Sequence, residues 1–312
     1  MNWLVLYHVT NSKEKDLFYQ ILDSIRKRVI KFNLHIVYLY TIAEDIDKGT
    51  LGRKEECKHY ELHFKRKGNK EYPDDREILT ILGELSPHYD GFVYSGHSSG
   101  YLFGREEDPI FSIVELAKTI EDTNHKFKVS IFDTCYVNNL ETLYHLRHIS
   151  DYIVATPSFC EDTSVLELDA FFDEDQNLVD YLKTIIDEYV IITESCPQDS
   201  GALRMSLVDT SGLEKLANSI RSVSPALTYD KNTIIHPADH KVHHICDVIL
   251  NAFDDGNLTQ EDLDHIVKNL RKTVIYSKSS MNPDSCHHTV CIGMYSELPY
   301  HPTGHEIEYF TF

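Results

Sequence analysis

A histidine and a cysteine each follow a short apolar stretch, in positions where a thiol and its base could meet. Residues 91–95 have the composition of a buried strand, and they lead into Gly-His-Ser-Ser-Gly, which contains His97. Residues 129–132 have the same character, and Cys135 stands in the turn that follows them. Cysteine attacks as a thiolate, and histidine is a common activating base. If the two strands are parallel neighbours, their carboxyl ends meet, and His97 and Cys135 form a dyad.

The segment around Cys135 predicts a strand, a helix and a second strand. Asn138 or Asn139 is suited to cap the helix, and residues 152–155 form the next apolar stretch. The apolar side chains between them recur at helical spacing, at Leu140, Leu143, Tyr144 and Ile149. This order is typical of a parallel βαβ unit, whose active loops lie at the carboxyl ends of the strands. The N-terminus of the helix would favour a thiolate on the preceding turn.

Further strands and helices alternate along the chain and predict an α/β fold. Residues 3–7 and 34–40 are expected to form strands, and the helix between them starts near Asn11. Residues 110–119 are expected to form a crossover helix, and residues 203–208 and 213–220 a late strand and helix. Such alternation favours a mostly parallel sheet with helices on both faces.

The sequence FDTCYVNNLETLYHLRHISDYIVAT resembles the nucleophile segment of the clostripain family of caspase-like cysteine peptidases. In that family an Asp-small-Cys tripeptide precedes a helix with Asn, Glu and Arg, and then a strand that begins Asp-Tyr. The matching residues here are Asp133, Cys135, Asn139, Glu141, Arg147, Asp151 and Tyr152. The upstream sequence YDGFVYSGHSSG is similar to the family's histidine segment.

This resemblance implies a caspase-like three-layer αβα sandwich that carries a cysteine endopeptidase site. Cys135 would be the nucleophile, His97 its base, and the backbone N–H groups of Ser98 and Cys135 the oxyanion donors. The family has glycine after the histidine, whereas this chain has Ser98. The backbone donor survives that change, but the conformational freedom of glycine does not. The chemistry requires no cofactor.

The resemblance also implies a preference for a basic residue before the cleaved bond. In the family, an acidic residue two positions before the cysteine helps to select arginine or lysine, and Asp133 has that place. A partly desolvated carboxylate pairs strongly with a cation and leaves other side chains with an uncompensated charge. Asp162, after the next strand, is a second candidate acid. The expected partner is therefore a protein or peptide with a basic residue, together with an activating or regulatory protein.

Ser98 leaves open two alternatives to a cysteine peptidase. Gly-His-Ser-Ser-Gly also satisfies G-x-S-x-G, the nucleophile elbow of serine hydrolases, with Ser98 as nucleophile. That motif requires a helix directly after the serine, whereas bulky aromatic residues at Tyr101 and Phe103 follow it here. The other alternative is a catalytically inactive caspase-like domain that serves as a binding or scaffold module.

Composition excludes several classes of partner. The chain of 312 residues has a net charge of -20, which repels nucleic acid and anionic membranes. Its seven cysteines are scattered and odd in number, which favours a reducing compartment over a disulfide framework. The apolar stretch at residues 3–7 is too short for a signal peptide. The sequence therefore predicts a cytoplasmic protein.

The whole chain, 1–312, is expected to be one domain with two distinctive regions. A charged insertion spans residues 44–73, with a hairpin expected near residues 60–64 and a basic loop tip at residues 65–70. That tip is either a solvated turn or a processing site. The second region is helical and rich in histidine, and it starts near residue 223.

The histidine-rich region raises the question of a metal site. His236, His240, His243 and His244 include an i,i+4 pair on a predicted helix, and Cys286, His287, His288 and Cys291 form a second cluster. The cysteine spacing is not one that zinc sites use, so no metal is expected.

Residues 251–258 resemble a calcium loop but place Phe253 at a ligand position. A helix that ends at Gly256 and another capped by Thr259 and Asp262 explain them better.

Overall fold

The central sheet has eight strands among the residues that the structure describes. The structure is a computed structural model, and it describes residues 1–28, 30–40, 58–63, 77–105, 108–157, 164–173, 176–194, 204–227, 229, 234–236, 239–279 and 293–295. The strands are β1 (Trp3–Val9), β2 (Leu34–Tyr40), β3 (Lys58–His63), β4 (Gly91–Ser95), β7 (Phe127–Asp133), β8 (Ser150–Ala155), β9 (Arg204–Asp209) and β12 (Val274–Ser279). Their order across the sheet is β12-β9-β8-β7-β4-β1-β2-β3.

Parallel pairing is confined to the middle of the sheet. β8, β7, β4, β1 and β2 run parallel to one another, whereas β9, β12 and β3 join antiparallel at the two sides. In the β4–β7 pair, Ser95 lies opposite Asp133. The predicted parallel neighbours are thus confirmed, and the strands that lead to His97 and Cys135 end side by side.

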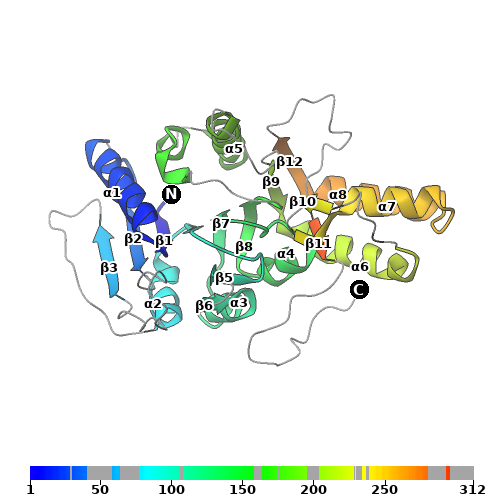
Figure 1. The fold of residues 1–312 in the computed structure, drawn as a ribbon, viewed down its shortest axis with the longest axis horizontal. Coiled ribbons are helices and arrows are strands. Elements are labelled where there is room, and N and C mark those ends of the chain that lie inside the picture. The colour runs from blue at the N-terminus through cyan, green and yellow to red at the C-terminus, as the bar shows by residue number, and fades with distance from the viewer. Residues whose placement is uncertain are drawn as a thin grey trace, which may run out of the picture.

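Helices cover both faces of this sheet, as Figure 1 shows. One face carries α1 (Ser12–Lys27) and α5 (Leu178–Glu194) over a core that includes Trp3 and Phe171. The other face packs against a second core, which includes Phe92 and Phe132. Its helices are α2 (Ile78–Leu85), α3 (Ile113–Glu121), α4 (Leu140–Leu146), α6 (Leu213–Val223), α7 (Ile245–Asp254) and α8 (Gln260–Thr273). The predicted three-layer αβα sandwich with a mostly parallel sheet is confirmed.

Gly91 leaves room for the indole of Trp3 on the neighbouring strand. A Cβ added at Gly91 would lie 2.5 Å from Cε3 and Cζ3 of Trp3, which is fully buried. Gly91→Ala is therefore expected to lower the free energy of unfolding by about 1–3 kcal/mol, the typical cost of overpacking. Urea denaturation measures this change, and a variant as stable as the wild type would contradict the assigned packing.

The connection after the His97 strand differs from the expected one. The predicted helix over residues 110–119 is present as α3, but it begins at Ile113, because the chain first forms a hairpin of β5 (Leu102–Arg105) and β6 (Asp108–Ser112). Ser112 explains the later start, because it forms a capping box with Glu115. The late strand β9 and helix α6 lie close to the predicted ranges.

The charged insertion contributes an edge strand. Its described part, β3, pairs antiparallel with β2 and so belongs to the main sheet rather than to a separate local hairpin. The rest of residues 44–73, including the basic tip at residues 65–70, lies outside the described residues. The assignment of residues 1–312 to one domain stays a prediction.

The predicted helical pair of His240 and His244 is wrong. Both residues belong to strand β11 (Asp239–His244), which lies between β10 (Ile234–His236) and β13 (Gly293–Tyr295) in a small second sheet. Four positions along a strand span about 13 Å, too far for the close approach that one helical turn would give.

The predicted end of one helix and start of the next, around Gly256, are confirmed. α7 ends at Asp254, Gly256 has a φ of 75°, and Thr259 and Asp262 form a capping box at the start of α8. Helix capping thus accounts for the sequence that resembles a calcium loop. In the described part of the chain, no helix has the length and apolar character needed to cross a membrane.

Candidate active site

His97 stands where the chain leaves β4. Gly96 before it has a φ of 152°, and a Cβ there would lie 2.9 Å from the carbonyl oxygen of His8, so a larger residue would be strained. The His97 carbonyl accepts two hydrogen bonds, from the Tyr94 hydroxyl at 2.8 Å and from the Gly104 N–H at 2.9 Å. These contacts hold the backbone of His97 while 45% of its side chain stays exposed.

Cys135 lies in the turn that joins β7 to α4 and is 8% exposed. Tyr136, the next residue, has a φ of 61°, a conformation that costs a non-glycine residue on the order of 1–2 kcal/mol. Asn139 supports this turn, because its amide donates to the Tyr136 carbonyl while its Oδ1 accepts from the Thr142 N–H in the first turn of α4. The predicted cap at Asn139 is confirmed. Strained residues of this kind are concentrated at functional sites.

Direct hydrogen bonds join the two loops. The hydroxyl of Thr134 donates to the Gly96 carbonyl at 2.6 Å, so the residues that precede Cys135 and His97 are in contact. Thr142 on α4 donates to the carbonyl of Gly100 at 2.8 Å. The structure therefore brings the cysteine and histidine loops together at the carboxyl edge of the sheet, as their strand positions predict.

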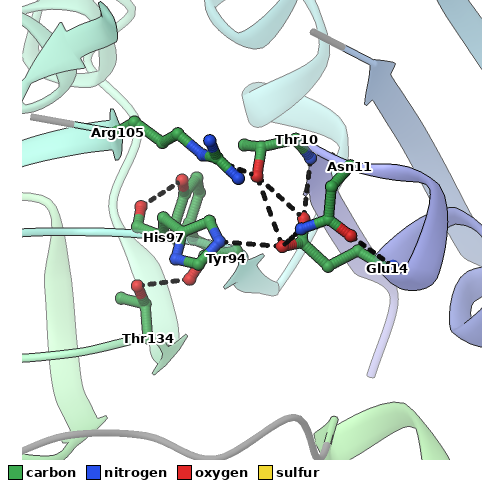
Figure 2. Close-up of polar contacts among 8 residues, drawn as sticks. Thr10, Asn11, Glu14, Tyr94, His97, Arg105 and Thr134 are labelled. Atoms are coloured by element: carbon green, nitrogen blue, oxygen red, sulfur yellow. Dashed lines mark hydrogen bonds and ion pairs between the residues drawn. The ribbon is translucent and has the colours of Figure 1, made fainter. Parts of the chain in front are cut away.

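A third residue, Glu14, joins this site from the start of α1 and is absent from the sequence-based prediction. Figure 2 shows its carboxylate beside the imidazole, with Oε1 2.9 Å from Nε2 of His97. Because β1 lies next to β4, the helix that follows β1 starts at the same edge. The sequence shows only that Glu14 is an acidic residue in the first turn of a helix that follows a strand. The strand order is needed to place that helix beside His97.

Glu14 is held ionised in a half-buried position. Burial raises its pKa, but the hydrogen bonds from His97 and Thr10, together with the charge of His97, outweigh that effect and lower the pKa to about 2. The Thr10 backbone N–H donates to Oε2 at 2.7 Å, and the Thr10 hydroxyl donates to the same oxygen at 3.1 Å.

The lowered pKa of Glu14 predicts a stability difference that depends on pH. A carboxyl whose pKa falls from 4.5 to about 2 on folding stabilises the protein above pH 4.5 and loses this contribution as pH falls toward 2. Relative to Glu14→Gln, the wild type should gain on the order of 2 kcal/mol at neutral pH after allowance for solvent screening. Chemical denaturation of both proteins between pH 2 and 7 measures the difference, and a constant difference would contradict the assignment.

Asp133 ends β7 and is almost fully buried, with 4% exposure. Its Oδ2 accepts from the Ser95 hydroxyl and from the Val165 N–H, both at 3.0 Å, and its Oδ1 accepts from the Tyr189 hydroxyl at 2.7 Å. Burial raises the pKa of Asp133, although these hydrogen bonds oppose the rise. The buried carboxylate is thus held by donors from three other segments.

Ser98 does not have the geometry of a nucleophile elbow. It forms an antiparallel bridge with Phe103 and leads into the strand β5, where an elbow would require a helix. Its hydroxyl accepts a 2.7 Å hydrogen bond from the Gly100 N–H. The serine hydrolase alternative therefore lacks its structural requirement.

Two predicted features fall on residues without a structural description. Asp162 lies outside the described residues, and so does the cluster of Cys286, His287, His288 and Cys291. Among the residues that are described, no three His, Cys, Asp or Glu side chains are arranged to hold a metal ion.

Comparison with known proteins is consistent with this arrangement. The model of the clostripain family matches residues 67–298. The structure of an inactive zymogen C11 protease from Parabacteroides distasonis aligns with a TM-score of 0.67 and 16% identity, over 94% of this chain and 91% of that one. A secreted C11 cysteine protease from Bacteroides thetaiotaomicron, iotapain, aligns with a TM-score of 0.65 and 15% identity, over 94% and 93% of the two chains. At these identities the structures show the fold alone. The comparison with curated proteins gave no match.

Proposed function

Because the chain belongs to the clostripain family of cysteine peptidases, we propose that it is an endopeptidase that uses Cys135 and His97 to cleave after arginine or lysine. One observation supports this assignment above the others. The hydrogen bond between Thr134 and Gly96 joins the residues directly before the cysteine and the histidine. A nucleophile and its base must lie within hydrogen-bond reach of each other or approach it when substrate binds.

The reaction follows from these two side chains. The sulfur of Cys135 attacks the peptide carbonyl while His97 holds the thiol proton. The tetrahedral adduct then collapses, its C–N bond breaks, and His97 gives the proton to the leaving amine. Water attacks the remaining thioester, His97 accepts a proton from it, and the thiol is restored as the acid product leaves.

The backbone N–H groups of Ser98 and Cys135 are the proposed oxyanion donors. In the antiparallel bridge between Ser98 and Phe103, the paired hydrogen bonds come from Ser99 and Gly104 instead. Among the described residues, the Ser98 N–H donates to no other group. It is therefore available to a negatively charged oxygen, and serine instead of glycine does not remove it.

Asp133 is the proposed selector of a basic substrate side chain, with Asp162 as a second acid. The net charge of -20 also favours basic peptides over acidic ones. Ser95, Tyr189 and Val165 already donate to the Asp133 carboxylate, so a substrate cation would have to displace one of these donors or share a carboxylate oxygen with it. Binding of a guanidinium or ammonium group would stabilise the charged form that burial disfavours.

Cytoplasmic action and an activating or regulatory protein partner are further predictions from the sequence.

A panel of fluorogenic peptides tests the proposal. Peptides with arginine, lysine, aspartate or leucine before the cleaved bond are compared for the wild type, for the wild type alkylated with iodoacetamide, and for Ser98→Ala. We expect cleavage after arginine and lysine that alkylation abolishes and Ser98→Ala retains. Activity that is lost in Ser98→Ala but survives alkylation would instead identify a serine hydrolase.

A further inference from the structure

The His97 imidazole has a partner on the side of α1. Nε2 of His97 lies 2.9 Å from Oε1 of Glu14, and this is its one hydrogen bond among the described residues. The Glu14 side chain is only 19% exposed, compared with 45% for His97. The contact therefore joins a half-buried carboxylate to a more exposed imidazole, whose other nitrogen, Nδ1, makes no hydrogen bond to the described residues.

Groups other than His97 also hold the Glu14 carboxylate. Thr10 donates to Oε2 through both its N–H and its hydroxyl, and the amide of Asn11 donates to Oε1. Arg105 from the β5 hairpin donates in turn to the Thr10 hydroxyl at 3.0 Å. Figure 2 shows this network on the side of the imidazole away from Thr134. A carboxylate held in this way before substrate arrives can orient the ring without reorganising.

We propose that Glu14 is a positioning residue for His97, which makes the site a Cys135–His97–Glu14 triad; this inference rests on the proposed peptidase function. An ionised carboxylate only accepts hydrogen bonds, so Nε2 of His97 must carry a hydrogen. Nδ1 is then the nitrogen that takes the thiol proton and later gives it to the leaving amine. Glu14 stays ionised throughout and stabilises the ring while it is positively charged.

Peptide turnover and thiol alkylation together test the role of Glu14. Glu14→Gln keeps the shape of the side chain but removes its charge, and Asp16→Asn removes one charge from an exposed position on the same helix. We expect Glu14→Gln to lower kcat by about 10²-fold with little change in KM, because positioned acid–base catalysis contributes at least that much. It should also slow alkylation of Cys135 by iodoacetamide at pH 7, whereas Asp16→Asn should change neither rate.

A conservative variant separates positioning from helix capping. Glu14→Asp keeps a carboxylate, so its turnover and alkylation rates should lie between those of Glu14→Gln and the wild type. All proteins are assayed well below the melting temperature of the least stable variant. If Glu14→Asp and Glu14→Gln lose turnover and alkylation rate equally, in step with their loss of stability, Glu14 has only a capping role and the proposal is overturned. Wild-type alkylation and turnover rates in Glu14→Gln would overturn it too.

The alkylation rate tests the positioning of His97 independently of peptide cleavage. If no peptide is cleaved in a Cys135-dependent manner, the endopeptidase proposal fails. Slower alkylation in Glu14→Gln, with Asp16→Asn unchanged, would still support the positioning of His97 beside the thiol. A Cys135 thiol that reacts at the same rate in all variants would reject the triad.

Discussion

Cys135→Ala is expected to lower kcat/KM for peptide cleavage by at least about 10³-fold, because it removes the sulfur of the proposed nucleophile. Cys135 lies in a turn held by the contacts of Thr134 and Asn139, and alanine leaves those contacts in place. The variant should therefore fold as the wild type does. Initial rates on the peptide with the best-cleaved basic residue measure the effect.

A second cysteine provides the matched control. Cys246 is half-buried on α7, on a helix that is not part of the candidate site. Cys246→Ala should keep wild-type kcat/KM and should still lose activity on alkylation, whereas residual activity in Cys135→Ala should not respond to alkylation. An equal loss of activity in both variants, or full activity in Cys135→Ala, would contradict the assignment of the nucleophile.

Asp133→Asn is expected to lower kcat/KM for arginine and lysine substrates by about 10²- to 10³-fold. A desolvated pair of opposite charges that loses one partner typically costs 2–5 kcal/mol, which corresponds to a change of that order. Cleavage after leucine, where present at all, should change much less. The ratio of the two kcat/KM values therefore reports contact with the substrate side chain.

The buried hydrogen bonds of Asp133 require a control for its structural role. Tyr189→Phe removes the 2.7 Å hydrogen bond to Oδ1 without changing the charge of Asp133. It should lower the free energy of unfolding by about 2 kcal/mol, the scale of a hydrogen bond to a charged group, and leave the preference for basic residues intact. If Asp133→Asn lowers stability and reduces cleavage of all substrates equally, Asp133 anchors β7 to α5 and does not select the substrate.

Local sequence patterns predicted the strands and turns at the site because their causes are local. Apolar stretches of strand length gave the His97 and Cys135 strands, and an asparagine before a helical repeat gave the cap at Asn139. The apolar pattern starts this helix at residue 110, whereas in the structure β6 comes first and Ser112 caps α3 with Glu115. The histidine spacing predicts a helix over His240 and His244, but pairing with the preceding strand β10 and the distant strand β13 makes their segment β11.

The sequence by itself therefore determined the α/β class and the resemblance to the clostripain family, and it indicated Cys135 and His97 as the candidate catalytic pair. Only the tertiary structure decided which other groups reach them. Glu14 meets His97 because β1 lies beside β4, and the partners of Asp133 come from Tyr189 and Val165, which are distant in the chain. Strand order is set by how the two cores pack on the sheet, and no short stretch of sequence contains that information.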